Sequence, residues 1–238
     1  SAARTLARDM AKVTRGQEVL IYADYEGDPA VVNETAKAVH NEGAMVAVMW
    51  YPTPSGVGEE TTPDLPSSLG AAMNRADLLI EFAGHYLLYS TPWEEAMKTQ
   101  RVKYLCLTGM TRDMVSRCLG NIDVPTLSRF QDRLTEMSRR AKRVKVTNPS
   151  GTDISFTNDQ TRAYFSEGII QDRPGDYMLI CQVDWAPVEL SLNGRIVFDG
   201  SVWPPEEVGV LRNPISLKVE NGVVKEIQGR PEAARFRK

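Results

Sequence analysis

The chain is poor in the residues that most often build metal and redox sites. It contains only two histidines, His40 and His85, and only three cysteines among 238 residues. Cys106, Cys118 and Cys181 form no C-x-x-C pair, so neither a zinc ribbon nor a dithiol redox motif is expected. Cys106 and Cys181 lie in apolar runs, where a buried, reduced thiol is the usual state, which favours a reducing compartment. A metal centre of ordinary composition is therefore hard to complete within these residues.

Long apolar runs and an excess of one charge are also missing. No stretch approaches the roughly 20 apolar residues of a membrane span, and residues 1–13 lack the apolar core of a signal peptide. The 28 Lys and Arg residues nearly balance the 31 Asp and Glu residues, so no global charge favours nucleic acid. We therefore expect a soluble, cytoplasmic protein that takes a small-molecule substrate and has no nucleic-acid or membrane partner.

Several nucleotide and acyl-transfer motifs are absent as well. No G-x-G-x-x-G follows the first apolar run, and no Walker lysine motif occurs. The G-x-S-x-G turn of a serine nucleophile elbow is missing too. These absences disfavour a nicotinamide-dependent dehydrogenase, a phosphate-binding-loop enzyme and an acyl-enzyme mechanism.

The first 141 residues alternate between strand and helix patterns. Val19–Ala23 is a short apolar run, and Asp28-Pro29 then provides a helix N-cap followed by proline at the first helical position. Strands spaced by helices favour a parallel, doubly wound sheet. The strands are expected over residues 19–23, 44–50, 76–82 and 102–108, and the helices over residues 29–42, from Thr91 onward with an N-terminal capping box, and over residues 112–119 and 125–140.

Residues 142–238 change character, since helical periodicity nearly disappears. Asn193-Gly194 and Asn221-Gly222 stand between β-favouring runs and predict two-residue hairpin turns. The fold class is therefore α/β, with an N-terminal doubly wound parallel domain, 1–141, followed by a mostly antiparallel β-rich domain, 142–238. Strands of the second domain are expected over residues 144–147, 154–157, 183–188, 195–198, 215–220 and 223–227.

The candidate chemistry rests mainly on acids. Glu167, Asp184 and Glu189 lie in one β-rich stretch, and carboxylates serve as ligands for hard metals and as general bases. Strand alternation places Gln182 and Asp184 on one face, although an edge strand with solvated acids is the alternative. His85 follows the third strand, where open α/β sheets bind ligands, and a structural role is its alternative.

Four segments carry a resemblance to known enzymes. They are RGQEVLI at 15–21, NPSGTDISF at 148–156, APVE at 186–189 with the nearby Asn-Gly pair, and residues 213–229 with the following Glu232-Ala233. In order and spacing they resemble the superfamily of aminopeptidase T type metallopeptidases and 2,5-dihydroxypyridine 5,6-dioxygenases. The resemblance covers most of the chain and implies an α/β domain followed by a metal-carrying β-rich domain.

The two branches of this superfamily imply different sites. In the dioxygenase branch two histidines and an aspartate hold Fe(II), and these ligands are expected beyond Lys238. An acid of that branch near the ring-cleaving centre corresponds to Glu167, as a substrate-orienting or proton-transferring group. The peptidase branch uses Zn, Co or Mn, and one of its metal-binding glutamates corresponds to Gln182. Because a neutral amide is a poorer metal ligand than a carboxylate, a two-metal site is disfavoured.

The favoured function is that of an Fe(II) ring-cleaving dioxygenase acting on a small hydroxylated N-heteroaromatic. Glu167 is expected to be catalytic, and Gln182, Asp184, Glu189 and His85 to bind substrate. The first alternative is a metal-dependent aminopeptidase. The second is a metal-free binding or assembly module.

The missing ligands favour a chain that is the N-terminal and central part of a longer enzyme, and the alternative is a shortened relative without catalysis. A helix beginning at Pro231 is expected to have nothing to pack into, which favours the same interpretation. The resemblance further implies a homo-oligomer.

Overall fold

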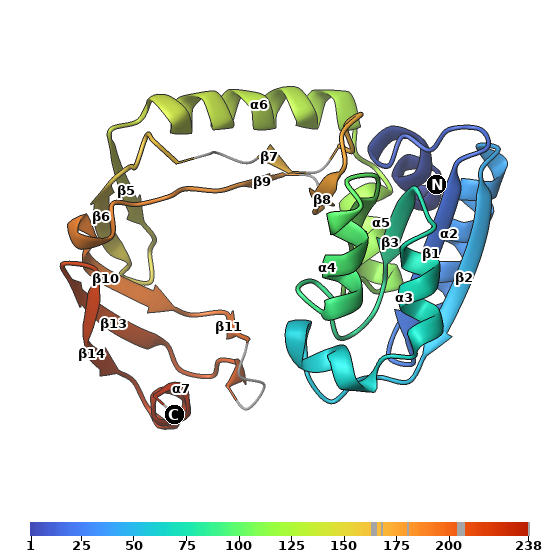
Figure 1. The fold of residues 1–238 in the computed structure, drawn as a ribbon. Helices are drawn as coiled ribbons and strands as arrows, with labels where there is room; N and C mark the ends of the chain where they lie inside the picture. The colour runs from blue at the N-terminus through green and yellow to red at the C-terminus, as the bar shows by residue number, and fades with distance from the viewer. Residues whose placement is uncertain (163–165, 168, 180, 204–207, 238) are drawn as a thin grey trace. The chain divides into compact units, whose positions relative to one another are not determined.

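The computed structural model describes the chain except for residues 163–165, 168, 180, 204–207 and 238 (Figure 1). The chain divides into two compact units. The first unit contains Ser1–Arg133 and Ser166–Val183, and the second contains Leu134–Phe165 and Asp184–Lys238. Each unit has a five-stranded sheet of its own.

The first unit is built on a parallel sheet with the strand order β2-β1-β3-β4-β8. Four of its strands lie where the sequence predicts them, so the expected parallel α/β fold is confirmed. The fifth, β8, was not predicted, because three residues are too few to show a periodic pattern. The strands are β1 (Glu18–Asp24), β2 (Met45–Tyr51), β3 (Leu78–Glu81), β4 (Lys103–Cys106) and β8 (Gly175–Tyr177).

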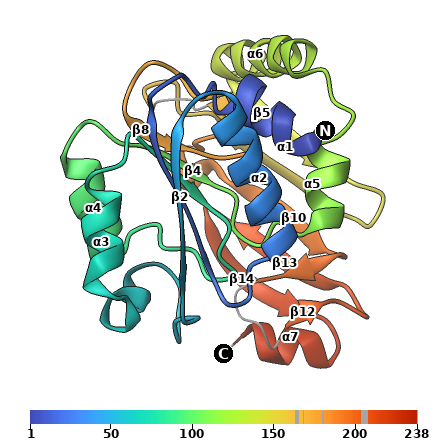
Figure 2. The ribbon, with the colours of Figure 1, turned by 90° about the vertical axis from the view of Figure 1, so that its right-hand side faces the viewer.

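Helices cover both faces of this sheet, and Figure 2 shows α3 and α4 on one side and α2 and α5 on the other. Strand β1 is buried on both faces for this reason: Ile21 packs in the cluster that contains Val32 of α2, and Tyr22 in the cluster that contains Leu69 of α3. The helical segments are α1 (Ala2–Arg4), η1 (Thr5–Met10), α2 (Pro29–Asn41), η2 (Gly58–Asp64), α3 (Ser67–Met73), α4 (Thr91–Lys98) and α5 (Arg112–Leu119).

Side-chain caps explain where these helices begin. The Asp28 carboxylate accepts from Ala30 N at 2.9 Å at the start of α2, as the sequence predicts. At α4 the expected capping box is wrong by one residue, because the cap is the Ser90 hydroxyl. Thr91 N instead donates to Thr62 Oγ1 at 3.0 Å, so this residue ties α4 to η2.

The longest described helix is α6 (Val124–Arg140), which begins one residue before the predicted start. Val124 at its start is buried in the apolar core, whereas the buried residues farther along the helix are polar: Gln131, Thr135 and Ser138. No helix among the described residues has the length and apolar composition that crossing a membrane would require.

The second unit contains an antiparallel sheet with the order β14-β13-β10-β6-β5, which confirms the expected β-rich character. Ile215, Leu217 and Val219 alternate inward along β13 and form the core of this unit. The elements are β5 (Arg143–Thr147), β6 (Asp153–Thr157), η3 (Glu189–Ser191), β10 (Asn193–Phe198), β11 (Ser201–Val202), β12 (Gly209–Val210), β13 (Ile215–Glu220), β14 (Val223–Gln228) and α7 (Pro231–Phe236).

Only one of the two Asn-Gly pairs forms the predicted hairpin turn. Asn221 and Gly222 form the predicted hairpin turn between β13 and β14, with φ angles of 48° and 75°. The hairpin predicted at Asn193-Gly194 is wrong, since both residues lie inside β10. A Cβ at Gly194 would overlap the Asp153 carbonyl oxygen, so glycine is needed here for close approach of two strands rather than for a turn.

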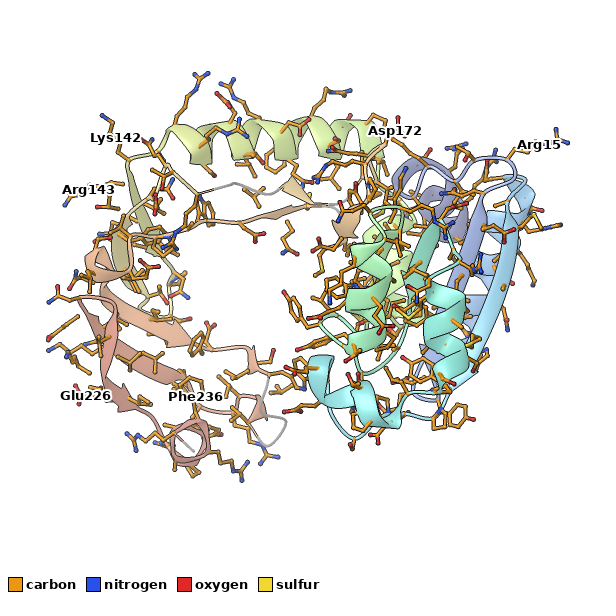
Figure 3. The ribbon with its side chains drawn as sticks, viewed as in Figure 1. Arg15, Lys142, Arg143, Asp172, Glu226 and Phe236 are labelled. Carbon is orange, nitrogen blue, oxygen red and sulfur yellow. The ribbon has the colours of Figure 1, made fainter. Side chains whose placement is uncertain are left out.

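The short C-terminal helix α7 packs against the second sheet. Ala233 is fully buried in the core of this unit, and the ring of Phe236, labelled in Figure 3, lies 5.9 Å from that of Phe198. The expectation that this helix has nothing to pack into is therefore wrong. Ala233 is small enough to let the helix backbone approach the sheet.

Candidate functional site

Two of the predicted site residues are neighbours across a short antiparallel ladder in the first unit. Strands β7 (Ser166–Glu167) and β9 (Gln182–Val183) pair so that Glu167 lies directly opposite Gln182. Only the backbone of Glu167 belongs to the described part of the chain, so its place comes from this register.

Gln131 of α6 holds this ladder in place. Its Oε1 accepts from Cys181 N at 2.8 Å, and its Nε2 donates to the Gln182 carbonyl oxygen at 3.0 Å. The Gln131 side chain is 3% exposed, and one amide group supplies both the donor and the acceptor that the passing backbone needs. Cys181 itself is exposed and has a φ of 84°, so the expectation of a buried thiol is wrong for this residue. The turn that Gln131 fixes directs the Cys181 side chain to the surface.

Asp184 follows this ladder but belongs to the second unit. The strand expected over 183–188 is wrong, because β9 ends at Val183 and the following backbone forms only an isolated bridge between Pro187 and Asn158. The expected common strand face of Gln182 and Asp184 therefore does not form.

Glu189 is an exposed acid in an ion pair. It begins η3, and its carboxylate accepts from Arg162 Nη2 at 2.5 Å. This hydrogen bond holds the pKa of Glu189 below its ordinary value. Arg162 also contacts Asp159 at 3.2 Å. Glu189 is therefore ionised at neutral pH. Its exposure and its ion pair agree with the alternative interpretation, in which the acids of this stretch are solvated and bind no ligand.

His85 lies where the sequence places it, in the loop after β3, and its ring is oriented by a hydrogen bond. Nδ1 is 2.8 Å from the Gly56 carbonyl oxygen. Because a carbonyl oxygen only accepts, Nδ1 must carry a hydrogen, and in the neutral ring Nε2 is then the proton acceptor. Nε2 is 3.9 Å from Glu26 Oε2, and the His85 side chain is 20% exposed. His85 can therefore accept a hydrogen bond or a proton from a ligand.

The loops around His85 form the point where the winding of the sheet reverses. The chain passes from β1 to β2 on one side and then to β3 on the other side of β1. A Cβ at Gly27 would lie 2.9 Å from the Phe82 carbonyl oxygen, so the loops after β1 and β3 are closely packed. Open α/β sheets bind ligands at such a reversal, outside the carboxyl ends of the strands. His85 thus occupies a favourable position for binding.

A buried acid beside this loop was missed by the sequence analysis. Glu81 at the end of β3 is 0% exposed, and its Oε2 accepts a hydrogen bond from the Tyr104 hydroxyl. Burial raises the pKa of Glu81 to about 7. The available signal was an acid inside the apolar run Leu78–Phe82, a composition that is unusual for a strand buried on both faces.

The described residues do not by themselves fit a metal centre. Among them, no three or more histidine, cysteine, aspartate or glutamate side chains are grouped so that they could hold a metal ion. His40 lies on α2, and His85 lies in the loop after β3. The iron ligands that the resemblance implies beyond Lys238 stay a prediction.

Comparisons with known proteins agree with this architecture. The family described as "NicX: 2,5-dihydroxypyridine 5,6-dioxygenase" matches residues 4–238. A 2,5-dihydroxypyridine dioxygenase from Pseudomonas putida KT2440 has a similar structure, with a TM-score of 0.72 and 21% identity over 99% of this chain and 69% of that chain. AmpT from Thermus thermophilus is also similar, with a TM-score of 0.69 and 16% identity over 99% of this chain and 72% of that chain. No curated protein matches the chain. At these identities the two structural likenesses establish the fold.

Proposed function

Because the chain belongs to the 2,5-dihydroxypyridine 5,6-dioxygenase family, we propose that it acts in the ring cleavage of a small hydroxylated N-heteroaromatic of the 2,5-dihydroxypyridine type. The family match over residues 4–238 is the observation that carries this proposal. A 5,6-dioxygenase breaks the ring bond between C5 and C6 and incorporates both oxygen atoms of O2 into the product.

Iron is the proposed cofactor, since the resemblance to the dioxygenase branch implies it. The described residues supply no ligand set for it. The contribution of this chain is instead to bind the ring, to orient its hydroxyl groups and to accept a proton from them.

The pair formed by Glu167 and Gln182 suits a hydroxylated ring. A carboxylate accepts a hydrogen bond or a proton from a ring hydroxyl, and a neutral amide can both donate and accept. His85 adds a second acceptor at Nε2. Substrate binding by Asp184 and Glu189, a homo-oligomeric state and a cytoplasmic location remain predictions.

Replacing Glu167 by glutamine tests this assignment. The substitution keeps the shape of the side chain and removes its basicity, so kcat for ring cleavage is expected to fall about 10²-fold. Turnover is measured as loss of 2,5-dihydroxypyridine absorbance with full-length protein loaded with Fe(II). Glu226→Gln on β14 is the matched control, because it removes a surface carboxylate from the second sheet. Equal turnover of the two variants would show that Glu167 has no such role.

A metal-dependent aminopeptidase is the second candidate, and the likeness to AmpT favours it. The neutral side chain of Gln182 counts against it, because the peptidase branch is expected to have a metal-binding glutamate there. Assays under oxygen and under nitrogen separate the two functions. Release of an N-terminal amino acid from peptides without oxygen, with no loss of 2,5-dihydroxypyridine under oxygen, would establish the peptidase and overturn the dioxygenase.

A further inference from the structure

Two buried carboxylates flank the segment that carries His85. Asp24 ends β1 and Glu81 ends β3, and both side chains are 0% exposed. The segment that links β3 to α4, residues 82–90, contains His85 and Leu87. Buried carboxylates are costly unless donors surround them, so their hydrogen-bond partners indicate what they do.

Asp24 binds the first part of this segment. Its Oδ1 accepts from Gly84 N at 2.9 Å, and its Oδ2 accepts from His85 N at 3.0 Å. Oδ1 also accepts from Glu26 N at 3.0 Å, so the same carboxylate joins the loop after β1 to the loop after β3. The backbone of His85 is therefore fixed by a side chain that lies 61 positions away in the sequence.

Glu81 binds the second part. Its Oε1 accepts from Leu87 N at 2.8 Å. Its Oε2 accepts from the Tyr104 hydroxyl and lies 3.9 Å from Cys106 Sγ. Three further titratable groups among the described residues interact electrostatically with Glu81: Asp24 and Tyr22 of β1 and Tyr51 of β2.

The partners of both acids are N–H, O–H and S–H groups, and the described residues include no ion pair of either acid. An apolar side chain at either strand end would avoid the desolvation cost and still fill the core. An apolar side chain could not, however, accept the hydrogen bonds that the amides of Gly84, His85 and Leu87 donate. Holding this segment is therefore the contribution that distinguishes the two acids.

We propose that Asp24 and Glu81 are positioning residues that together hold the segment 82–90 and so present the His85 ring at the carboxyl edge of the sheet. Asp24 fixes the His85 backbone, and the bond from Nδ1–H to the Gly56 carbonyl oxygen then fixes the ring, with Nε2 3.9 Å from Glu26 Oε2. The effect on catalysis rests on the proposed function, whereas the positioning of His85 does not.

Amide hydrogen exchange at single-residue resolution tests the positioning. Glu81→Ala removes the acceptor of Leu87 N, and exchange at Leu87 is expected to accelerate about tenfold or more. Glu81→Gln keeps an oxygen in the same place and is expected to restore most of the protection. Asp24→Ala is expected to accelerate exchange at Gly84 and His85 by a similar factor.

The amides of Ile21 in β1 and Val219 in β13 serve as internal controls for general loss of stability. A positioning role requires that exchange accelerates in the segment 82–90 by a larger factor than at these two amides. Acceleration by one common factor in all of them, or unchanged exchange at Leu87 in Glu81→Ala, would overturn the proposal.

Turnover of 2,5-dihydroxypyridine by the full-length protein loaded with Fe(II) tests the catalytic consequence. Glu81→Ala is expected to lower kcat/KM about tenfold, and Glu81→Gln to retain more activity than Glu81→Ala. If the unaltered protein cleaves no ring, the proposed function fails while the exchange experiment still decides the positioning. If exchange in the segment accelerates and kcat/KM stays unchanged, the link from positioning to catalysis is wrong.

Discussion

Gly194→Ala is expected to destabilise the second unit by about 4 kcal/mol. Gly194 has a φ of 134°, and an L-residue held there costs about 1–3 kcal/mol. An added Cβ would overlap the Asp153 carbonyl oxygen and lie 2.8 Å from Ile154 Cα, so β6 and β10 must separate, at a further cost of about 1–3 kcal/mol. Typical domains are stable by about 5–15 kcal/mol, so the loss is a large fraction of the total.

Gly200→Ala is the matched control for this substitution. It lies shortly after β10, and a Cβ there would meet nothing within 4 Å. A change below about 0.5 kcal/mol is expected for it. Chemical denaturation followed by circular dichroism and by amide exchange at Leu217 measures both variants. If Gly194→Ala is as stable as Gly200→Ala, the two strands do not approach each other at this glycine.

The free energy of unfolding is expected to fall by about 3 kcal/mol as the pH rises from about 4.5 to about 7, through Glu81 alone. The pKa of this carboxyl is raised from 4.5 to about 7, chiefly by burial, so the folded state binds a proton that the unfolded state has released. Stability from this group is therefore fully present below pH 4.5 and is lost by the time the pH exceeds the folded pKa. The Tyr104 hydroxyl and Leu87 N–H limit the shift, whereas the nearby Asp24 increases it.

Glu81→Gln isolates this contribution, because the amide does not titrate. Urea unfolding at several pH values between 4.5 and 8 gives the free energy of unfolding of both proteins, and the difference between them removes every other titrating group. The variant is expected to gain on the unaltered protein by about 3 kcal/mol across this range. Glu94→Gln on the surface of α4 is the control, since its carboxylate pairs with Lys98 in solvent. Parallel curves for the unaltered protein and Glu81→Gln would contradict the raised pKa.

Local patterns were sufficient for most of the regular elements. Asp28-Pro29 marks the start of α2, the predicted bounds of α5 and β13 agree with the structure, and Asn221-Gly222 forms its turn. These features depend on residues within about one turn or one hairpin of each other. For that reason a single stretch of sequence contains the whole signal.

Patterns failed where a contact from a distant part of the chain decided the outcome. Asn193-Gly194 has the composition of a turn, but pairing with β6 and β13 on both sides keeps it in β10. Strand β8 is formed by its pairing with β4, about 70 positions earlier in the chain. A strand of three residues has no periodicity of its own that could reveal it.

In the candidate site, too, a residue with a local sequence signal was predicted and a residue that acts through distant contacts was not. His85 was predicted as a site residue because it follows an apolar strand, and ligands bind at the ends of parallel strands. Gln131 was missed, because a glutamine on a helix gives no sign that it binds the backbone of Cys181 and Gln182, about 50 positions later.

The sequence by itself determined the parallel α/β sheet, the antiparallel sheet that follows it, and the family to which the chain belongs, since strand periodicity, helix caps and motif order are properties of short segments. Only the tertiary structure decided that the backbone of Glu167 pairs with that of Gln182 and that Asp24 and Glu81 accept hydrogen bonds from the loop of His85. Register, burial and the pKa of a carboxyl depend on which distant groups the fold brings within hydrogen-bond distance, and no local pattern contains that information.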